Sequence, residues 1–182
     1  VLVALSMGGL VALTLAARAP ELERALVVVD IAPEVQRGGV DNIRNFVAAT
    51  DELDTFEDFV QRAHSFNPRR TLANIRERLR HNLRQLPTGR WTWKYDPQLR
   101  NPARVGEAMG DLWAEVAKIR CPVLIVRGGE SDILAPEVAA RFGGIVKAEV
   151  RTVPGAGHSV MGDNPSGFLA AVEPFLAGLA PA

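Results

Sequence analysis

The sequence lacks several features that would point to particular classes of protein. Its 182 residues include one cysteine, Cys121, so no disulfide can form within the chain, and no cluster of cysteines can hold a metal. No apolar run is longer than that at residues 1–5, which is far too short to span a bilayer. The 21 basic side chains equal the 21 acidic ones in number, so no charge excess points to nucleic acid or to a solvating tail. We therefore expect neither a nucleic-acid nor a membrane partner.

The chain also lacks an initiator methionine and a polar lead-in before its first apolar segment. Natural termini usually carry a few loosely held polar residues ahead of the first element. The sequence therefore predicts that upstream residues are missing, and any signal peptide would be missing with them. A cytoplasmic location is the default expectation.

Three short apolar runs are typical of buried strands, residues 1–5, 26–29 and 122–126, and residues 148–153 are expected to form a fourth strand. Helical patterns follow the first and third runs, and a last helix is predicted to start at Asn164 and Pro165, a cap residue followed by proline at the first turn. Strands that alternate with helices indicate an α/β fold with a mostly parallel sheet flanked by helices.

Between the second and third runs the sequence becomes polar, charged and helical. Thr55 and Thr71 each precede a helical pattern with apolar residues at spacings of three and four. We therefore expect residues 1–32 and 119–182 to form one core, with residues 33–118 as a helical insert.

Four residues whose side chains can take part in catalysis follow the predicted strands: Ser6, Asp30, Asp132 and His158. In parallel sheets, reactive groups lie in loops at the carboxyl ends of the strands. A serine hydroxyl is a poor nucleophile until a base takes its proton, and a carboxylate must orient that base and offset its charge. These residue types therefore point to nucleophilic catalysis.

The turn Ala4-Leu5-Ser6-Met7-Gly8 joins a strand directly to a helix. It resembles the nucleophile elbow of the α/β-hydrolase family, usually Gly-x-Ser-x-Gly, with Ala4 in place of the first glycine. A subset of bacterial lipases in that family has the same replacement. The resemblance covers nearly the whole chain and implies an α/β-hydrolase fold with Ser6 as nucleophile. It also implies that the Met7 N–H contributes to an oxyanion hole at the start of the following helix.

The same resemblance implies roles for the other strand-end residues. His158, in a glycine-rich turn, corresponds to the general base, and Asp132 corresponds to the carboxylate that orients it. Some family members place the acid after the preceding strand, so Asp30 stays an alternative, as does Glu130 beside Asp132. The order Ser, acid, His matches the family under each of these choices.

The resemblance also bears on the missing upstream part and on the insert. The four strands resemble the fifth to eighth of the usual sheet, and the second oxyanion N–H would come from a loop before Ser6. The insert corresponds to a cap over the active site, where Trp91, Trp93 and Met109 could line an apolar substrate pocket. His64 and His81 form no ligand cluster, so we predict no metal. No other cofactor is expected.

These expectations favour a serine hydrolase that cleaves a small, hydrophobic carboxylic ester or lactone through an acyl-enzyme on Ser6. The alternatives are a C–C bond hydrolase of aromatic breakdown, which shares the triad, and a ligand sensor on the same scaffold that does not turn over. The expected partner is a small-molecule substrate, and the sequence leaves the oligomeric state open.

Overall fold

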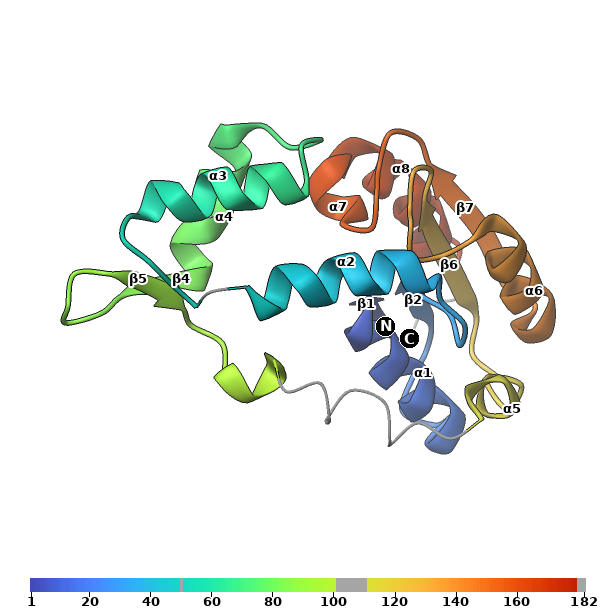
Figure 1. Cartoon of the computed structure of the whole chain (residues 1–182). Coiled ribbons are helices and arrows are strands. Elements are labelled where there is room, and N and C mark those ends of the chain that lie inside the picture. Colours follow the sequence, from blue (N-terminus) through green and yellow to red (C-terminus); the bar gives the residue numbers. More distant parts are fainter. Residues whose placement is uncertain (50, 101–110, 180–182) are drawn as a thin grey trace. The chain divides into compact units, whose positions relative to one another are not determined.

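The structure of the chain is a computed structural model that describes residues 1–49, 51–100 and 111–179 (Figure 1). Within these residues no helix is long and apolar enough to cross a bilayer. The chain divides into two compact units, which are described separately. The core unit comprises Val1–Val40 and Met109–Ala182, and the insert unit comprises Asp41–Ala108.

The core unit contains four strands in the order β1-β2-β6-β7, all parallel. The strands are β1 (Leu2–Leu5), β2 (Leu26–Val29), β6 (Val123–Gly128) and β7 (Glu149–Val153). The helices are α1 (Met7–Arg18), α5 (Leu112–Val116), α6 (Pro136–Val146), α7 (Val160–Asp163) and α8 (Pro165–Ala177). This arrangement confirms the α/β fold and the parallel four-stranded sheet predicted from the sequence.

Strands β2 and β6 are buried on both faces, which explains why their sequences are continuous apolar runs. Val27 and Leu124 pack with Val172 of α8 on one face. The next residues along these strands, Val28 and Ile125, point the other way and lie against α1 and α6. The sheet is therefore sandwiched between α8 on one side and α1 and α6 on the other.

Strand β1 lies at the edge of this sheet and pairs only with β2. Its apolar run suggests a strand buried on both faces, but Leu2 is 36% exposed and Val3 is 48% exposed. The difference arises because an edge strand has a neighbour on one side only.

The boundary between the units differs from the predicted insert, residues 33–118, at both ends. Leu112 and Val116 of α5 are buried, and α5 packs against α1 in the core unit. Glu115 of α5 forms an ion pair with Arg18 of α1. Helix α2 (Arg37–Ala48) begins in the core unit, where Gly39 approaches the backbone of Asp132. Packing against the core therefore decides where the insert unit begins and ends.

The insert unit combines helices with a small antiparallel sheet of order β3-β5-β4. Its elements are the rest of α2, β3 (Glu52–Leu53), α3 (Phe56–Phe66), α4 (Leu72–Asn82), β4 (Leu83–Gln85), β5 (Trp91–Trp93) and a 3-10 turn, η1 (Pro97–Arg100). Its core is an apolar cluster formed by Phe59, Val60, Ile75, Leu79 and Leu83. The insert unit thus has an apolar core of its own.

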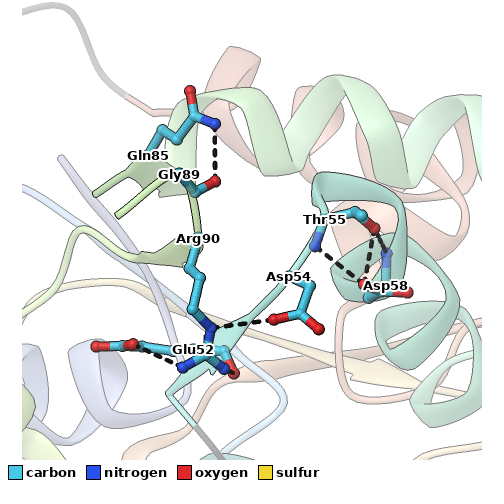
Figure 2. A network of polar contacts seen from close by, with 7 residues as sticks. All are labelled: Glu52, Asp54, Thr55, Asp58, Gln85, Gly89 and Arg90. Atoms are coloured by element: carbon cyan, nitrogen blue, oxygen red, sulfur yellow. Dashed lines mark hydrogen bonds and ion pairs between the residues drawn. The ribbon is translucent and has the colours of Figure 1, made fainter. Parts of the chain in front are cut away.

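A network of charged side chains ties β3 to the β4–β5 hairpin (Figure 2). The Arg90 guanidinium donates to the Glu52 carboxylate at 3.1 Å, to the Glu52 carbonyl at 2.9 Å and to Asp54 at 3.1 Å. Gln85 donates to the Gly89 carbonyl at 2.8 Å across the turn of the hairpin. These groups are solvent-exposed, so each ion pair by itself contributes little to the free energy of folding. Together the contacts of Arg90 hold β3 next to the hairpin.

Helix α3 begins with a capping box that the sequence pattern predicts (Figure 2). The Thr55 hydroxyl accepts from the Asp58 N–H at 3.1 Å, and the Asp58 carboxylate accepts from the Thr55 N–H at 3.0 Å. We expect Thr55→Ala to lower the free energy of unfolding by about 1 kcal/mol, measured by urea denaturation. Ser65→Ala removes an exposed hydroxyl of the same helix and should change it by less than about 0.5 kcal/mol. Equal losses in the two variants would contradict a specific capping role.

Candidate active site

Ser6 forms the turn between β1 and α1, with φ 54° and ψ −126°. Its N–H donates to the Val29 carbonyl at 3.1 Å, which fixes the turn against β2. A non-glycine residue in this region of positive φ carries strain of about 1–3 kcal/mol, and such strain is concentrated at functional sites. The Ser6 side chain makes no capping bond to its own helix, so the hydroxyl is not used as a helix cap.

Close packing at this turn depends on Gly9 rather than on Gly8. A Cβ on Gly9 would lie 2.5 Å from Ile31 Cγ2 and 3.3 Å from the Ala4 carbonyl oxygen. A Cβ on Gly8, the last glycine of the elbow pattern, would meet nothing within 4 Å. The bare backbone of Gly9 is therefore what lets α1 approach the sheet closely enough to form the turn.

The amino end of α1 has the properties of an anion site. The first N–H groups of a helix have no acceptor within the helix, and the helix dipole places partial positive charge there. The first turn of α1 carries no acidic side chain and receives no side-chain cap. Met7 is its first residue, directly after Ser6, so its N–H is placed where the elbow pattern predicts an oxyanion donor.

Asp30 directly follows β2 and is fully buried, and its φ of 51° is also positive. Its carboxylate accepts three hydrogen bonds: from the Gly128 N–H at 2.8 Å, the Ser131 hydroxyl at 2.5 Å and His158 Nδ1 at 2.8 Å. All three partners can donate, so the two carboxylate oxygens are held by hydrogen bonds from three sides. Three segments that are far apart in the sequence thus meet at one buried charge.

The contact with Asp30 determines the tautomer of His158. A carboxylate can only accept, so Nδ1 of His158 carries the proton in this hydrogen bond. In the neutral ring Nε2 is then left with a lone pair, which is the form that a general base requires. The His158 side chain is 17% exposed, so the ring is held by the protein and still reaches solvent.

The structure differs from the expectation that Asp132 orients His158. The carboxylate hydrogen-bonded to the ring is Asp30, which the sequence left as the alternative. Asp132 and Glu130 are both exposed. The reason lies in the turn after β6, which directs the Ser131 side chain inward to Asp30 and leaves the next residue facing solvent.

Backbone contacts on both sides fix the turn that carries His158. The Gly157 N–H donates to the Asp163 carboxylate at 3.0 Å, and the Asn164 side chain donates to the Pro154 carbonyl at 3.0 Å. Gly155 has φ 68°, a conformation that explains the glycine at that position. The ring of His158 therefore projects from a turn held at both ends.

Buried Arg127 holds the neighbouring turn, between β6 and α6. Its guanidinium donates to the Leu134 carbonyl at 2.7 Å and to the Gly129 carbonyl at 3.3 Å. The two acceptors lie on either side of Ser131, so the guanidinium closes the turn that presents the serine hydroxyl to Asp30. Nothing in the sequence pattern distinguishes Ser131 or Arg127 from ordinary turn residues, and both were missed there.

The only cysteine is not an activated nucleophile. Cys121 lies just before β6, where burial raises the pKa of the thiol and nearby Glu23 raises it further. The protonated thiol is the unreactive form. In the part of the chain that the structure describes, no group of three His, Cys, Asp or Glu residues is arranged to hold a metal ion.

The three residues expected to bind substrate fall in or next to the insert unit. Met109 lies outside the described residues. Trp91 and Trp93 are half-buried in the insert unit, where they make edge-to-face contacts with Phe56 and Phe59, each at 5.2 Å between ring centroids. The structure thus gives both tryptophans a packing role, and their contact with substrate stays a prediction.

Comparisons with known proteins identify the family of the chain. Residues 1–172 match the alpha/beta hydrolase family. Esterase Rv0045c of Mycobacterium tuberculosis is 30% identical over 188 aligned positions, which cover 94% of this chain and 58% of the esterase. The sn-1-specific diacylglycerol lipase ABHD11 of Mus musculus is 32% identical over 184 positions, covering 97% of this chain and 59% of the lipase.

Solved structures show the same likeness. The crystal structure of an alpha/beta hydrolase from Novosphingobium aromaticivorans superimposes with a TM-score of 0.79 at 27% identity, covering 96% of this chain and 64% of that one. The chain therefore spans less than two thirds of the length of these relatives. The match over residues 1–172 nevertheless includes Ser6, Asp30 and His158, and the chain belongs to the alpha/beta hydrolase family.

Proposed function

We propose that this chain is the catalytic part of a serine hydrolase that cleaves a small, hydrophobic carboxylic ester through an acyl-enzyme on Ser6. The observation that carries the proposal is the buried pair of Asp30 and His158, whose hydrogen bond measures 2.8 Å. Asp30 follows β2, and His158 lies in the turn after β7. The edge strand of the same sheet, β1, leads into the strained Ser6 turn. The esterase and the lipase that resemble the chain are, by their names, enzymes that cleave carboxylic esters.

In the first half of the proposed reaction, Ser6 Oγ attacks the ester carbonyl carbon while His158 Nε2 takes the hydroxyl proton. The positive charge that forms on His158 is offset by Asp30, which keeps its own negative charge. The Met7 N–H donates to the oxyanion of the tetrahedral intermediate. As the intermediate collapses, His158 returns the proton to the leaving alkoxide, and the alcohol departs.

In the second half, water replaces the alcohol. His158 takes a proton from water, and the resulting hydroxide attacks the acyl carbon and forms a second tetrahedral intermediate. Collapse breaks the bond to Ser6 Oγ, and the proton on His158 goes back to that oxygen. The free carboxylic acid leaves, and the enzyme returns to its starting form.

The preference for a hydrophobic acyl group rests on the aromatic residues of the insert unit. We propose Trp91 and Trp93 as the residues that contact an apolar acyl group. A small-molecule ester is the only partner that this mechanism requires, and neither a metal nor another cofactor takes part in any step.

A fluorophosphonate probe tests the proposal without knowledge of the substrate, because the probe reacts only with an activated serine. We expect a stoichiometric adduct on Ser6, located by mass spectrometry of peptides, and no adduct in Ser6→Ala. Hydrolysis of p-nitrophenyl esters of increasing acyl length, followed in the same two proteins, then measures the acyl preference. Absence of an adduct in a wild-type protein whose melting curve shows it to be folded would overturn the serine-hydrolase assignment.

A further inference from the structure

Ser131 occupies an unusual place beside the Asp30–His158 pair. It lies in the turn after β6, and its exposed fraction is only 9%. Its hydroxyl contacts the same carboxylate oxygen, Asp30 Oδ2, that contacts the histidine ring. Neither the sequence pattern nor the mechanism proposed above assigns Ser131 a role.

The hydrogen bonds of this hydroxyl are fully accounted for. A serine hydroxyl has one proton to donate and two lone pairs that accept. Ser131 Oγ accepts from the Ile133 N–H and from the Leu134 N–H, both at 3.1 Å. Both lone pairs are therefore occupied, and the single proton must point along the 2.5 Å contact to Asp30.

This arrangement fixes the Asp30 carboxylate against rotation. The Gly128 N–H holds Oδ1 at 2.8 Å, and the Ser131 hydroxyl holds Oδ2. The serine oxygen is itself held by two backbone N–H groups of a turn that Arg127 closes through the Leu134 carbonyl. With both oxygens fixed, Oδ2 stays in line with Nδ1 of His158.

We infer that Ser131 is a positioning residue that acts through Asp30: its hydroxyl orients the carboxylate and shares the oxygen that faces His158. The inference rests on the proposed function for its kinetic consequence, while its structural basis is independent of turnover. Ser131 touches neither the substrate nor the reacting atoms in this mechanism, so its removal should slow the chemical step without weakening substrate binding.

The expected kinetic effect of Ser131→Ala is a fall in kcat of about 10- to 100-fold, because small displacements of a catalytic pair cost rates of this size. KM should change by less than about twofold.

Two further variants separate positioning from a general loss of structure. Ser131→Thr keeps the hydroxyl and should restore most of the rate lost in Ser131→Ala. Ser65→Ala removes an exposed hydroxyl that donates to the Gln61 carbonyl within α3, and it should leave kcat and KM unchanged. Melting curves for each variant set a temperature at which all the proteins are folded.

NMR of the protein labelled with ¹⁵N-histidine supplies a readout that needs no activity. The Nδ1 proton of His158, identified by its loss in His158→Gln, should shift or exchange faster in Ser131→Ala and stay in place in Ser65→Ala. A wild-type rate and an unmoved His158 proton in Ser131→Ala would overturn the inference. If the wild type shows no Ser6-dependent hydrolysis, the proposed function fails, and the His158 proton alone decides whether Ser131 positions the pair.

Discussion

Asp30→Asn should lower kcat for ester hydrolysis by about 10⁴-fold, whereas Asp132→Asn should change it by less than about threefold. The two variants make the same chemical change at the ends of neighbouring strands. Asp30 is fully buried and hydrogen-bonded to His158, while Asp132 is exposed to solvent. The comparison therefore tests directly which of the two carboxylates works with the histidine.

The size of the effect follows from the tautomer of His158. In Asp30→Asn the amide oxygen can take the Oδ1 position and accept from the Gly128 N–H, which puts the amide NH₂ at the Oδ2 position, facing Nδ1 of His158 and the Ser131 hydroxyl. The ring must then accept at Nδ1 and carry its proton on Nε2, so it can no longer take the proton of Ser6. The buried negative charge that offsets the imidazolium is lost as well.

Steady-state kinetics with a p-nitrophenyl ester gives kcat for both variants, and melting curves recorded by circular dichroism verify that each variant is folded. Fluorophosphonate labelling provides a second readout, since the adduct on Ser6 should form slowly in Asp30→Asn and at the wild-type rate in Asp132→Asn. A large loss in Asp132→Asn with little change in Asp30→Asn would show that His158 works with the other carboxylate, against the geometry described above.

Gly128→Ala should destabilise the protein by about 1–3 kcal/mol and lower kcat by about 10²-fold. A Cβ at this position would lie 2.2 Å from the Gly157 carbonyl oxygen and 2.7 Å from the Ala156 carbonyl oxygen. Both atoms belong to the backbone just before His158, which the Asp163 carboxylate holds through the Gly157 N–H. Because backbone cannot move aside like a flexible side chain, the turn and its histidine must shift together.

Gly144→Ala is the matched control, because a Cβ there meets nothing within 4 Å and the residue lies inside α6. Alanine favours a helix interior over glycine, so this variant should be more stable than the wild type by about 0.5–1 kcal/mol. Its kcat should be unchanged. Urea denaturation and ester kinetics on the two variants test this pair of opposite effects, and a stable, fully active Gly128→Ala would contradict the close approach of the two turns.

The sequence by itself determined the α/β fold class and placed Ser6, Asp30 and His158 after predicted strands. Continuous apolar runs specified strands buried on both faces, as β2 and β6 are, because such strands have no polar face to display. The direct change from strand to helix at Ser6 specified a sharp turn. Both signals are local, since each depends on residues that are neighbours along the chain.

Only the tertiary structure decided how the strand-end groups pair. Asp30 and Asp132 both follow strands that lie side by side in the sheet, so the sequence order allowed either carboxylate to meet His158. The choice depends on which residue of the turn after β6 points inward, and that residue is Ser131. Side-chain direction in an irregular turn depends on contacts with distant residues such as Asp30, and sequence periodicity carries no information about those contacts.

The limits of the insert were decided in the same way. Helix α5 follows the polar segment in sequence, but its buried Leu112 and Val116 pack in the core unit together with α1. The apolar residues of α5 show that one face of this helix must be buried. They do not show which helix will cover that face. The sequence therefore determined which elements and reactive groups the protein has, and the packing of distant segments determined which groups work together.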